Sequence, residues 1–336
     1  MNDRAVELLE QYEIEVLRTR KGRGAIVCDT DQGCLILKEY SGNGDKLDIQ
    51  NRLLQNISDN ISDKGLIQVE QIVPTREGSL LVRDADGTGY VLKTWIDGRE
   101  CNIYDRSECS LAVSLLAQLH QCMELPADTP NLPVPFSPAK EYDKHNRELK
   151  RVKKYLKQKG QKTWFEISLQ NSFDYFLEQA QTVTEEWKEY SALSEASEAS
   201  DCGFVTFCHG DYQYHNILKG NNGWFLVNFE KCLPDNSVRD LYLLMRKLLE
   251  KGNWAVSLGT ELLEAYEKES PLPAMSRIDL YYRLSYPEKF WKIANFYYNS
   301  GKAWIPGRNQ EKLEKLIAQE KEKQHFLDEV FRSVRR

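Results

Sequence analysis

Long hydrophobic runs are missing from this chain of 336 residues, and so is any surplus of basic residues. A membrane-spanning helix needs about 18 or more consecutive apolar residues. No stretch of the sequence approaches that length, and the mean hydropathy is −0.58. The formal net charge of −6 and the pI of about 5.6 argue against a nucleic-acid binder, because such domains usually carry a basic excess or stripe. We therefore expect neither a membrane nor a nucleic acid among the partners.

Cysteine pairs of the CxxC type are missing as well. No signal peptide is recognisable, and no long apolar segment interrupts the cysteines. This pattern indicates reduced thiols in an intracellular protein, because disulfide frameworks belong to oxidising compartments. The eight cysteines are Cys28, Cys34, Cys101, Cys109, Cys122, Cys202, Cys208 and Cys232.

One segment places an Asp and an Asn five residues apart inside an apolar frame. Residues 207–218 read FCHGDYQYHNIL, with Asp211 and Asn216 at the two positions. In a phosphotransferase loop the Asp accepts the proton of an attacking hydroxyl, and the Asn amide oxygen reaches a metal ion. A lone Asp in a turn is usually a turn former. The joint pattern favours Asp211 as a catalytic base and Asn216 as a metal ligand.

A second segment, residues 224–230, reads WFLVNFE and predicts a strand that ends at the metal site of a kinase. The position that should hold the metal-binding Asp is Asn228. An amide oxygen coordinates Mg²⁺ without cancelling its charge, so the affinity for the metal should fall. Glu230 lies two residues on, on the same face of an extended segment, and either reaches the metal itself or is solvated or paired with a nearby lysine. Phosphotransfer activity is therefore left open.

These residues, together with Arg239-Asp240-Leu241, resemble the catalytic half of the aminoglycoside and choline kinase superfamily. Residues 90–101, 212–216 and 295–304 further resemble the CotS-type spore coat proteins, and the likeness runs from about Leu17 to about Leu327. The resemblance implies an α+β, two-lobed protein-kinase-like fold. A small N-lobe, residues 1–97, would hold an antiparallel sheet and one helix. A large, mainly helical C-lobe, residues 98–336, would hold the catalytic loop 207–218 and the metal-loop equivalent 224–231.

The resemblance also implies a nucleotide site. Lys38 matches the lysine that pairs with nucleotide phosphates, and Asp48 is the candidate acidic partner on the following helix. Gly22 and Gly24 either let main-chain N–H groups approach phosphates or form a simple turn. His209 and Asp240 would support the catalytic loop. The hinge that contacts the adenine edge through its main chain would comprise Lys93, Thr94, Trp95 and Ile96.

Hydrophobic periodicity predicts the elements of both lobes. Alternation over residues 14–40 indicates three strands, helical spacing covers residues 45–57, and residues 66–73, 79–83 and 89–95 return to strands. Prolines in the stretch 126–138 predict a surface loop, and residues 191–200 predict a loop or a frayed helix. The remaining predicted helices are 107–123, 237–250, 258–268, 277–299 and 310–332.

Two further features each allow two interpretations. The basic run 144–162 either grips an anionic acceptor or coat partner, or forms a solvated helix face. The aromatic residues between 281 and 304 either line an acceptor pocket or fill a core.

Two functions follow. The first is ATP-dependent, Mg²⁺-assisted phosphotransfer to a hydroxyl of an unknown acceptor. The second is a catalytically weak or inactive pseudokinase that binds coat proteins as a scaffold. Phosphorylation of an antibiotic is a third, weaker alternative, because the C-terminal region shows no concentrated acidic cluster. The resemblance implies assembly onto the spore coat from the mother-cell cytoplasm.

Overall fold

The computed structural model describes residues 7–22, 24–61, 67–135, 137–197, 203–221, 223–300, 307–332 and 334, and the side chains of residues 193–197 lie outside this description. The chain forms two compact units. Unit 1 comprises residues 1–135, 202–240 and 268–270, and unit 2 comprises residues 136–201, 241–267 and 271–336. This division differs from the predicted lobes, and it places the loop 207–218 in the same unit as the N-terminal sheet.

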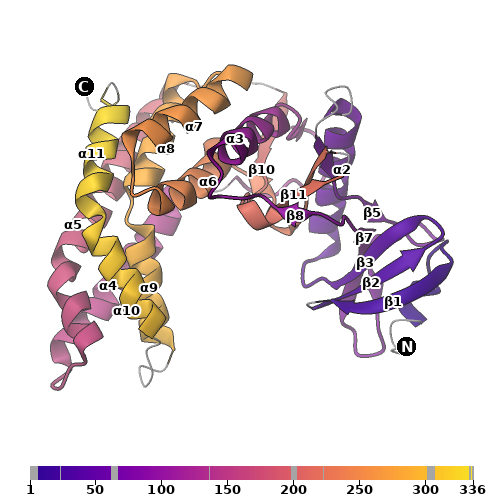
Figure 1. Cartoon of the computed structure of the whole chain (residues 1–336), viewed down its shortest axis with the longest axis horizontal. Coiled ribbons are helices and arrows are strands. Elements are labelled where there is room, and N and C mark those ends of the chain that lie inside the picture. Colours follow the sequence, from indigo (N-terminus) through magenta and orange to yellow (C-terminus); the bar gives the residue numbers. More distant parts are fainter. Residues whose placement is uncertain are drawn as a thin grey trace. The chain divides into compact units, whose positions relative to one another are not determined.

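The N-terminal sheet of unit 1 is antiparallel, as predicted, and Figure 1 shows it as a twisted sheet. Its strand order is β1-β2-β3-β7-β5, and β6 pairs with β7. Alternation along β3 buries Leu37 against Leu8 and Tyr12 on one face, and so turns Lys38 to the other face. The strands are β1 (Val16–Gly22), β2 (Ala25–Thr30), β3 (Gly33–Glu39), β5 (Ile72–Val73), β6 (Val82–Arg83) and β7 (Gly89–Thr94).

A second sheet of unit 1 brings distant segments together in the order β4-β12-β11-β8. The single strand predicted for residues 66–73 is instead two strands in two different sheets, because β4 pairs in parallel with β12 while β5 pairs with β7. This pairing sets the residues that follow β4 beside the residues that follow β12. The strands are β4 (Ile67–Val69), β8 (Arg99–Glu100), β11 (Ile217–Gly220) and β12 (Gly223–Leu226), and a third sheet joins β9 (Glu124–Pro126), β10 (Phe204–Cys208) and β13 (Leu233–Pro234).

The helices largely follow the apolar periodicity, but two predicted helices are each divided. The segment 277–299 breaks at Pro287, whose ring cannot continue a helix, and the segment 310–332 is interrupted at Gln319. The helices are α2 (Gly44–Ile61), α3 (Arg106–His120), α4 (Pro138–Gln158), α5 (Trp164–Ser197), α6 (Val238–Lys251), α7 (Val256–Glu269), α8 (Ala274–Ser285), α9 (Glu288–Asn299), α10 (Gly307–Ala318) and α11 (Glu320–Val330).

Unit 2 is built on an aromatic and aliphatic core between α4, α5, α8, α9 and α10. Tyr286, Phe290 and Tyr297 belong to this core, so most of the aromatic run predicted either as a pocket or as a core is core. Phe296 is exposed, and Trp304 lies outside the described residues.

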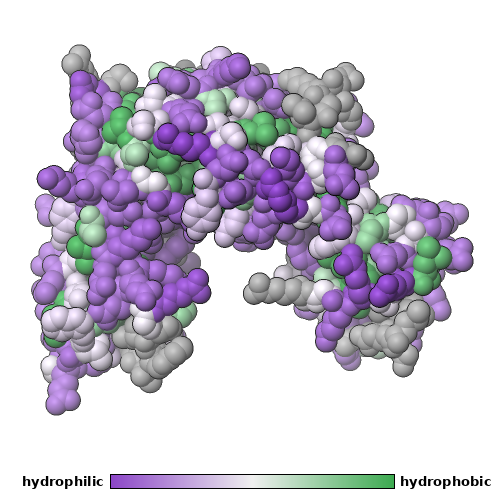
Figure 2. Space-filling model, viewed as in Figure 1, coloured by the Kyte–Doolittle hydropathy of each residue, from purple (hydrophilic) through white to green (hydrophobic). Residues whose placement is uncertain are grey.

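Polar side chains cover much of the visible surface in Figure 2. The lysines and arginines of α4 mostly lie on its exposed side, because the buried stripe of that helix consists of other residues. This supports the interpretation of the basic run as a solvated helix face. Among the described helices, none is long and apolar enough to cross a membrane.

Candidate functional site

A cavity of about 540 Å³ lies beside the loop that follows β10. Its lining includes five residues that the sequence predicted for the site, namely Lys38, Asp211, Asn216, Asn228 and Glu230. Lys38 comes from β3, and the others come from the loop before β11 and the turn after β12. The structure therefore brings these five residues together, although Lys38 and Glu230 are 192 positions apart in the chain.

The main chain before Asp211 is held by two buried side chains, those of Asp240 and His209. The Asp240 carboxylate accepts the N–H groups of His209 at 2.6 Å and of Gly210 at 2.9 Å. The His209 Nδ1 accepts the Asp211 N–H at 3.2 Å, so its Nε2 carries the proton and donates to the Val227 carbonyl at 3.1 Å. Burial lowers the pKa of His209, which agrees with this neutral form. Both side chains fix the loop without lining the cavity.

Gly210 is the point where this loop meets the turn after β12. Its φ of +78° lies in the left-handed region, and a Cβ at this position would lie 2.1 Å from the Lys231 carbonyl oxygen. A side chain larger than hydrogen would force the two segments apart. The glycine before Asp211 is therefore what allows the loop 207–218 to approach the turn after β12.

Asp211 is ion-paired in this structure. Its carboxylate contacts the Lys231 ammonium at 2.9 Å and accepts the Gln213 side-chain amide at 2.7 Å. Burial raises the pKa of Asp211, but Lys231 and Gln213 outweigh burial and hold the pKa below its usual value. A carboxylate in this state is ionised and can accept a hydrogen bond from a hydroxyl, although its low proton affinity makes it a weak base.

Asn216 and Asn228 are joined to each other. The Asn228 Nδ2 donates to the Asn216 Oδ1 at 2.7 Å, and the Asn216 Nδ2 donates to the Asp211 carbonyl at 2.8 Å. Asn228 has φ 70° and ψ 54°, a left-handed conformation that asparagine adopts more readily than most residues. The side chain and the main chain of Asn228 thus both suit the turn after β12.

Lys38 extends from the sheet to this turn. Its ammonium contacts the Asn228 Oδ1 at 2.9 Å and the Glu230 Oε1 at 2.8 Å. The same Glu230 oxygen accepts the Lys93 ammonium at 2.9 Å. Burial raises the pKa of Glu230, but Lys93 and Lys38 outweigh burial and lower the pKa to about 2. The sequence left open whether Glu230 reaches a metal or is solvated or paired with a nearby lysine. In the structure it is paired with Lys38 and Lys93.

Glu70 completes this ion-pair network, and sequence reasoning missed it. Its Oε1 accepts the Lys93 ammonium at 2.9 Å and the Phe229 N–H at 3.0 Å. Burial alone would lower the pKa of Lys93, but Glu70 and Glu230 raise it, so the buried lysine stays charged. Glu70 reaches the site because β4 pairs in parallel with β12. No local sequence pattern reveals this pairing, so no signal in the sequence indicated the role of Glu70. Lys93, predicted as a main-chain hinge residue, lies within β7 and contacts Glu70 and Glu230 with its side chain.

The oxygens predicted to hold Mg²⁺ do not suit that ion in this arrangement. The Asn216 and Asn228 oxygens each accept an N–H donor, and the Glu230 Oε1 accepts two ammonium groups. Mg²⁺ prefers anionic oxygens in octahedral geometry, whereas this set offers one carboxylate already neutralised by lysines. Among the described residues, no group of three or more His, Cys, Asp or Glu side chains is placed to hold a metal.

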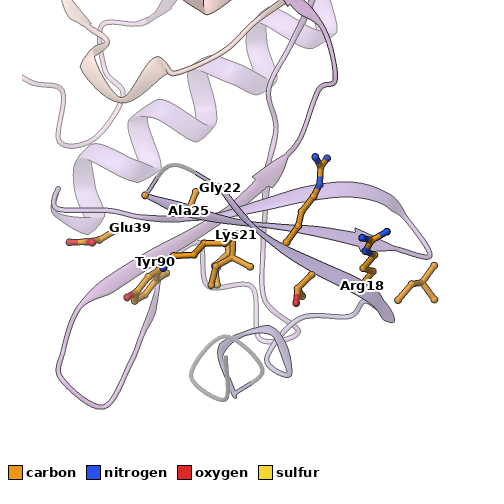
Figure 3. Close-up of a pocket in the computed structure, with 12 residues that line it drawn as sticks. Arg18, Lys21, Gly22, Ala25, Glu39 and Tyr90 are labelled. Carbon is orange, nitrogen blue, oxygen red and sulfur yellow. The ribbon is translucent and has the colours of Figure 1, made fainter. Parts of the chain in front are cut away.

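The glycine pair lines a different cavity. Gly22 and Gly24 belong to the lining of a larger one, of about 910 Å³, which runs along β1 and also contacts Leu37 and Tyr90 (Figure 3). Leu37 and Tyr90 lie on the face of the sheet opposite Lys38, by alternation and by the register of β3 with β7. In this structure the glycines form a hairpin turn with no part in the lining of the Lys38 cavity.

The predicted hinge, residues 93–96, begins inside β7 and ends just after it, and Thr94, Trp95 and Ile96 line a third cavity of about 440 Å³. Two of its main-chain N–H groups are already used. Thr94 donates to the Gln71 carbonyl at 2.9 Å, and Trp95 donates to the Cys34 carbonyl at 2.8 Å. A base in this cavity would therefore find fewer main-chain donors than the sequence suggests.

The prediction of Asp48 as the partner of Lys38 needs correction. Asp48 is exposed on α2, because its neighbours Leu47 and Ile49 occupy the buried side of that helix. The carboxylate that contacts the Lys38 ammonium is that of Glu230.

Known proteins resemble this chain along nearly its full length. Spore coat protein S of Bacillus subtilis (strain 168) is 23% identical over 342 residues, covering 96% of this chain and 93% of that protein. The aminoglycoside phosphotransferase of Alicyclobacillus acidocaldarius subsp. acidocaldarius DSM 446 superposes with a TM-score of 0.81 at 19% identity, covering 98% of this chain and 96% of that one. Amicoumacin kinase hAmiN, solved in complex with AMP-PNP, Ca²⁺ and Ami, gives a TM-score of 0.59 at 11% identity, covering 98% of this chain and 94% of that one.

These likenesses confirm the predicted α+β kinase-like fold and the predicted spore coat kinship. The family described as "Spore coat putative kinase YutH" matches residues 5–330. A match of that extent identifies the chain as a member of the YutH family of spore coat kinase-like proteins.

Proposed function

We propose that this protein is a kinase-fold component of the spore coat that binds a nucleotide in the cavity around Lys38. The observation that carries the proposal is the Lys38 ammonium, which lines the cavity with its side chain 37% exposed and its position set by Asn228 and Glu230. A positioned ammonium beside main-chain turns is a common means of binding phosphates. The nucleotides bound by fold neighbours lend further support.

A thermal unfolding assay with ADP tests this proposal. A ligand that binds only the folded protein raises its melting temperature. We expect ADP to raise the melting temperature of the wild type and of Lys21→Ala, which removes an exposed lysine from the opposite face of the sheet. We expect no shift for Lys38→Ala. Equal shifts in all three proteins would contradict a site at Lys38.

Phosphotransfer to a hydroxyl is the second candidate function. The placement of Asp211 and Asn216 favours it, because both line the cavity and the ionised Asp211 carboxylate can accept a hydrogen bond from a hydroxyl. The predicted role of Mg²⁺ with Asn216, Asn228 and Glu230 stays a prediction, and the present donor set speaks against it. The rate at which ADP is released from ATP, compared between the wild type and Asp211→Asn, tests this candidate function. An equal rate in both proteins would rule out Asp211 as base.

Coat partners and localisation complete the proposal. The relative from Bacillus subtilis is a spore coat protein, and we infer that this chain assembles onto the coat from the mother-cell cytoplasm, with coat proteins or a hydroxyl-bearing acceptor as partners. A fluorescent fusion should surround the forespore during sporulation. A signal spread evenly through the mother cell would contradict the inference.

A further inference from the structure

The Lys38 ammonium lies between two oxygens that the sequence predicted to bind Mg²⁺. It lies 2.9 Å from the Asn228 Oδ1 and 2.8 Å from the Glu230 Oε1. These are two of the three residues predicted to bind Mg²⁺. An ammonium has three N–H donors, so these two contacts leave one donor for a phosphate oxygen in the cavity.

Glu230 is held away from a metal by a second lysine. The Lys93 ammonium contacts Glu230 and Glu70 at 2.9 Å each, and the Lys93 side chain is only 2% exposed. If Glu230 turned away to bind a metal ion, the buried Lys93 ammonium would be paired with one carboxylate, that of Glu70, instead of two. Because buried charges are costly unless they are paired, Glu70 and Lys93 favour the position of Glu230 beside Lys38.

The charges that line the cavity already balance. Three lysines, at positions 38, 46 and 231, stand against three carboxylates, at positions 39, 211 and 230. Glu230 and Asp211 are each paired with lysine, while Glu39 is exposed and lies on the opposite side of β3 from Lys38. Within the described part of the chain, Lys46 forms no ion pair. No surplus negative charge remains to attract a divalent cation, whereas an anion would meet Lys38 and Lys46.

We propose that the Lys38 ammonium, held by Asn228 and Glu230, replaces the divalent metal in this cavity, so that the protein binds nucleoside diphosphates and triphosphates without a metal. This inference rests on the proposed nucleotide binding and specifies its mode. It assigns Glu230 as a positioning residue for Lys38, and Glu70 and Lys93 as the residues that position Glu230.

Calorimetric titration of ADP into the full-length protein, once in EDTA and once in Mg²⁺, tests the inference. We expect the two dissociation constants to agree within about threefold, and Lys38→Ala to weaken binding in EDTA by about tenfold or more. Lys21→Ala is the matched control and should bind as the wild type does. Binding that requires Mg²⁺ would overturn the inference and leave the proposed function intact. The absence of binding under both conditions would overturn both.

A titration with Mn²⁺ alone, followed by electron paramagnetic resonance, gives a readout that needs no nucleotide. We expect the wild type to leave Mn²⁺ free and Asn228→Asp to bind it, because the variant adds a carboxylate beside Asn216. Binding of Mn²⁺ at this cavity by the wild type, lost in Glu230→Gln, would also overturn the inference. Circular dichroism of each variant checks that it is folded.

Discussion

At the scale of single residues, Asn228 connects the parts of the cavity. Its Oδ1 accepts from Lys38 on the sheet, its Nδ2 donates to Asn216 in the loop 207–218, and its main chain forms the turn after β12. An aspartate at this position could accept the lysine but could not donate to Asn216, because a carboxylate has no N–H group. The amide therefore suits a site built on hydrogen bonds more than one built on a metal.

Replacing Asn228 separates its side-chain role from its main-chain role. Asn228→Ala loses both hydrogen bonds and places alanine in a left-handed conformation, which costs about 1–2 kcal/mol. Asn228→Gly loses the same bonds without that cost. We expect both variants to be less stable than the wild type in urea unfolding, and the glycine variant to be the more stable of the two. A glycine variant less stable than the alanine variant would contradict this account of the turn.

The Glu230 ion pairs predict a pH dependence of stability. The neighbouring lysines lower the pKa of Glu230 from 4.5 to about 2 in the folded protein, so its contribution to stability is fully present above about pH 4.5 and is lost as the pH falls toward 2. We expect Glu230→Gln to be less stable than the wild type at pH 7, and the difference to shrink as the pH falls from 6 to 3. A difference in unfolding free energy that stays constant over this range would contradict the assignment.

At the scale of elements, the loop 207–218 depends on a close approach to the turn after β12. Gly210→Ala would place a Cβ 2.1 Å from the Lys231 carbonyl oxygen and strain the main chain at φ +78°. We expect a loss of more than about 2 kcal/mol in the free energy of unfolding. The matched control is Gly44→Ala at the start of α2, where a Cβ would meet nothing within 4 Å. Equal stability of the two variants would show that the segments are not in tight contact.

Elements with a regular local pattern could be predicted from the sequence. The three N-terminal strands, helix α2 and the segment that presents Asp211 and Asn216 all follow from alternation, helical spacing and one motif. Pro287 also carried a local signal, which the continuous apolar periodicity of residues 277–299 hid.

Elements and contacts defined by distant pairing could not be predicted. Glu70 reaches Lys93 and Phe229 only because β4 pairs in parallel with β12, more than 150 positions away. The same pairing places Glu230 near Lys93. No sequence pattern around Lys38 indicates this contact between Glu230 and Lys93. Asp48 was chosen because it lies on the helix after Lys38, but the apolar side of that helix turns Asp48 outward.

At the scale of the whole molecule, the candidate site belongs to one of the two compact units. Lys38, Glu70, Lys93 and the residues from His209 to Asp240 are all in unit 1. Unit 2 has its own core of aromatic and aliphatic side chains. A ligand in the cavity should therefore act first on unit 1.

Hydrogen exchange with and without saturating ADP tests this placement. Because ligand binding suppresses local opening around its site, we expect slower exchange in β3, in the loop 207–218 and in the turn 227–231. The α4 and α5 helices of unit 2 serve as the internal reference and should change less. Protection confined to unit 2 would contradict a site at Lys38.

A nucleotide site organised by lysine instead of by a metal is the central proposal for this protein. The most direct test is the heat of ADP binding to the full-length protein in EDTA, compared between the wild type and Lys38→Ala. We expect the wild type to bind ADP in EDTA, and Lys38→Ala to bind it more weakly by about tenfold or more. Binding by neither protein in EDTA, with binding by the wild type restored by Mg²⁺, would contradict it.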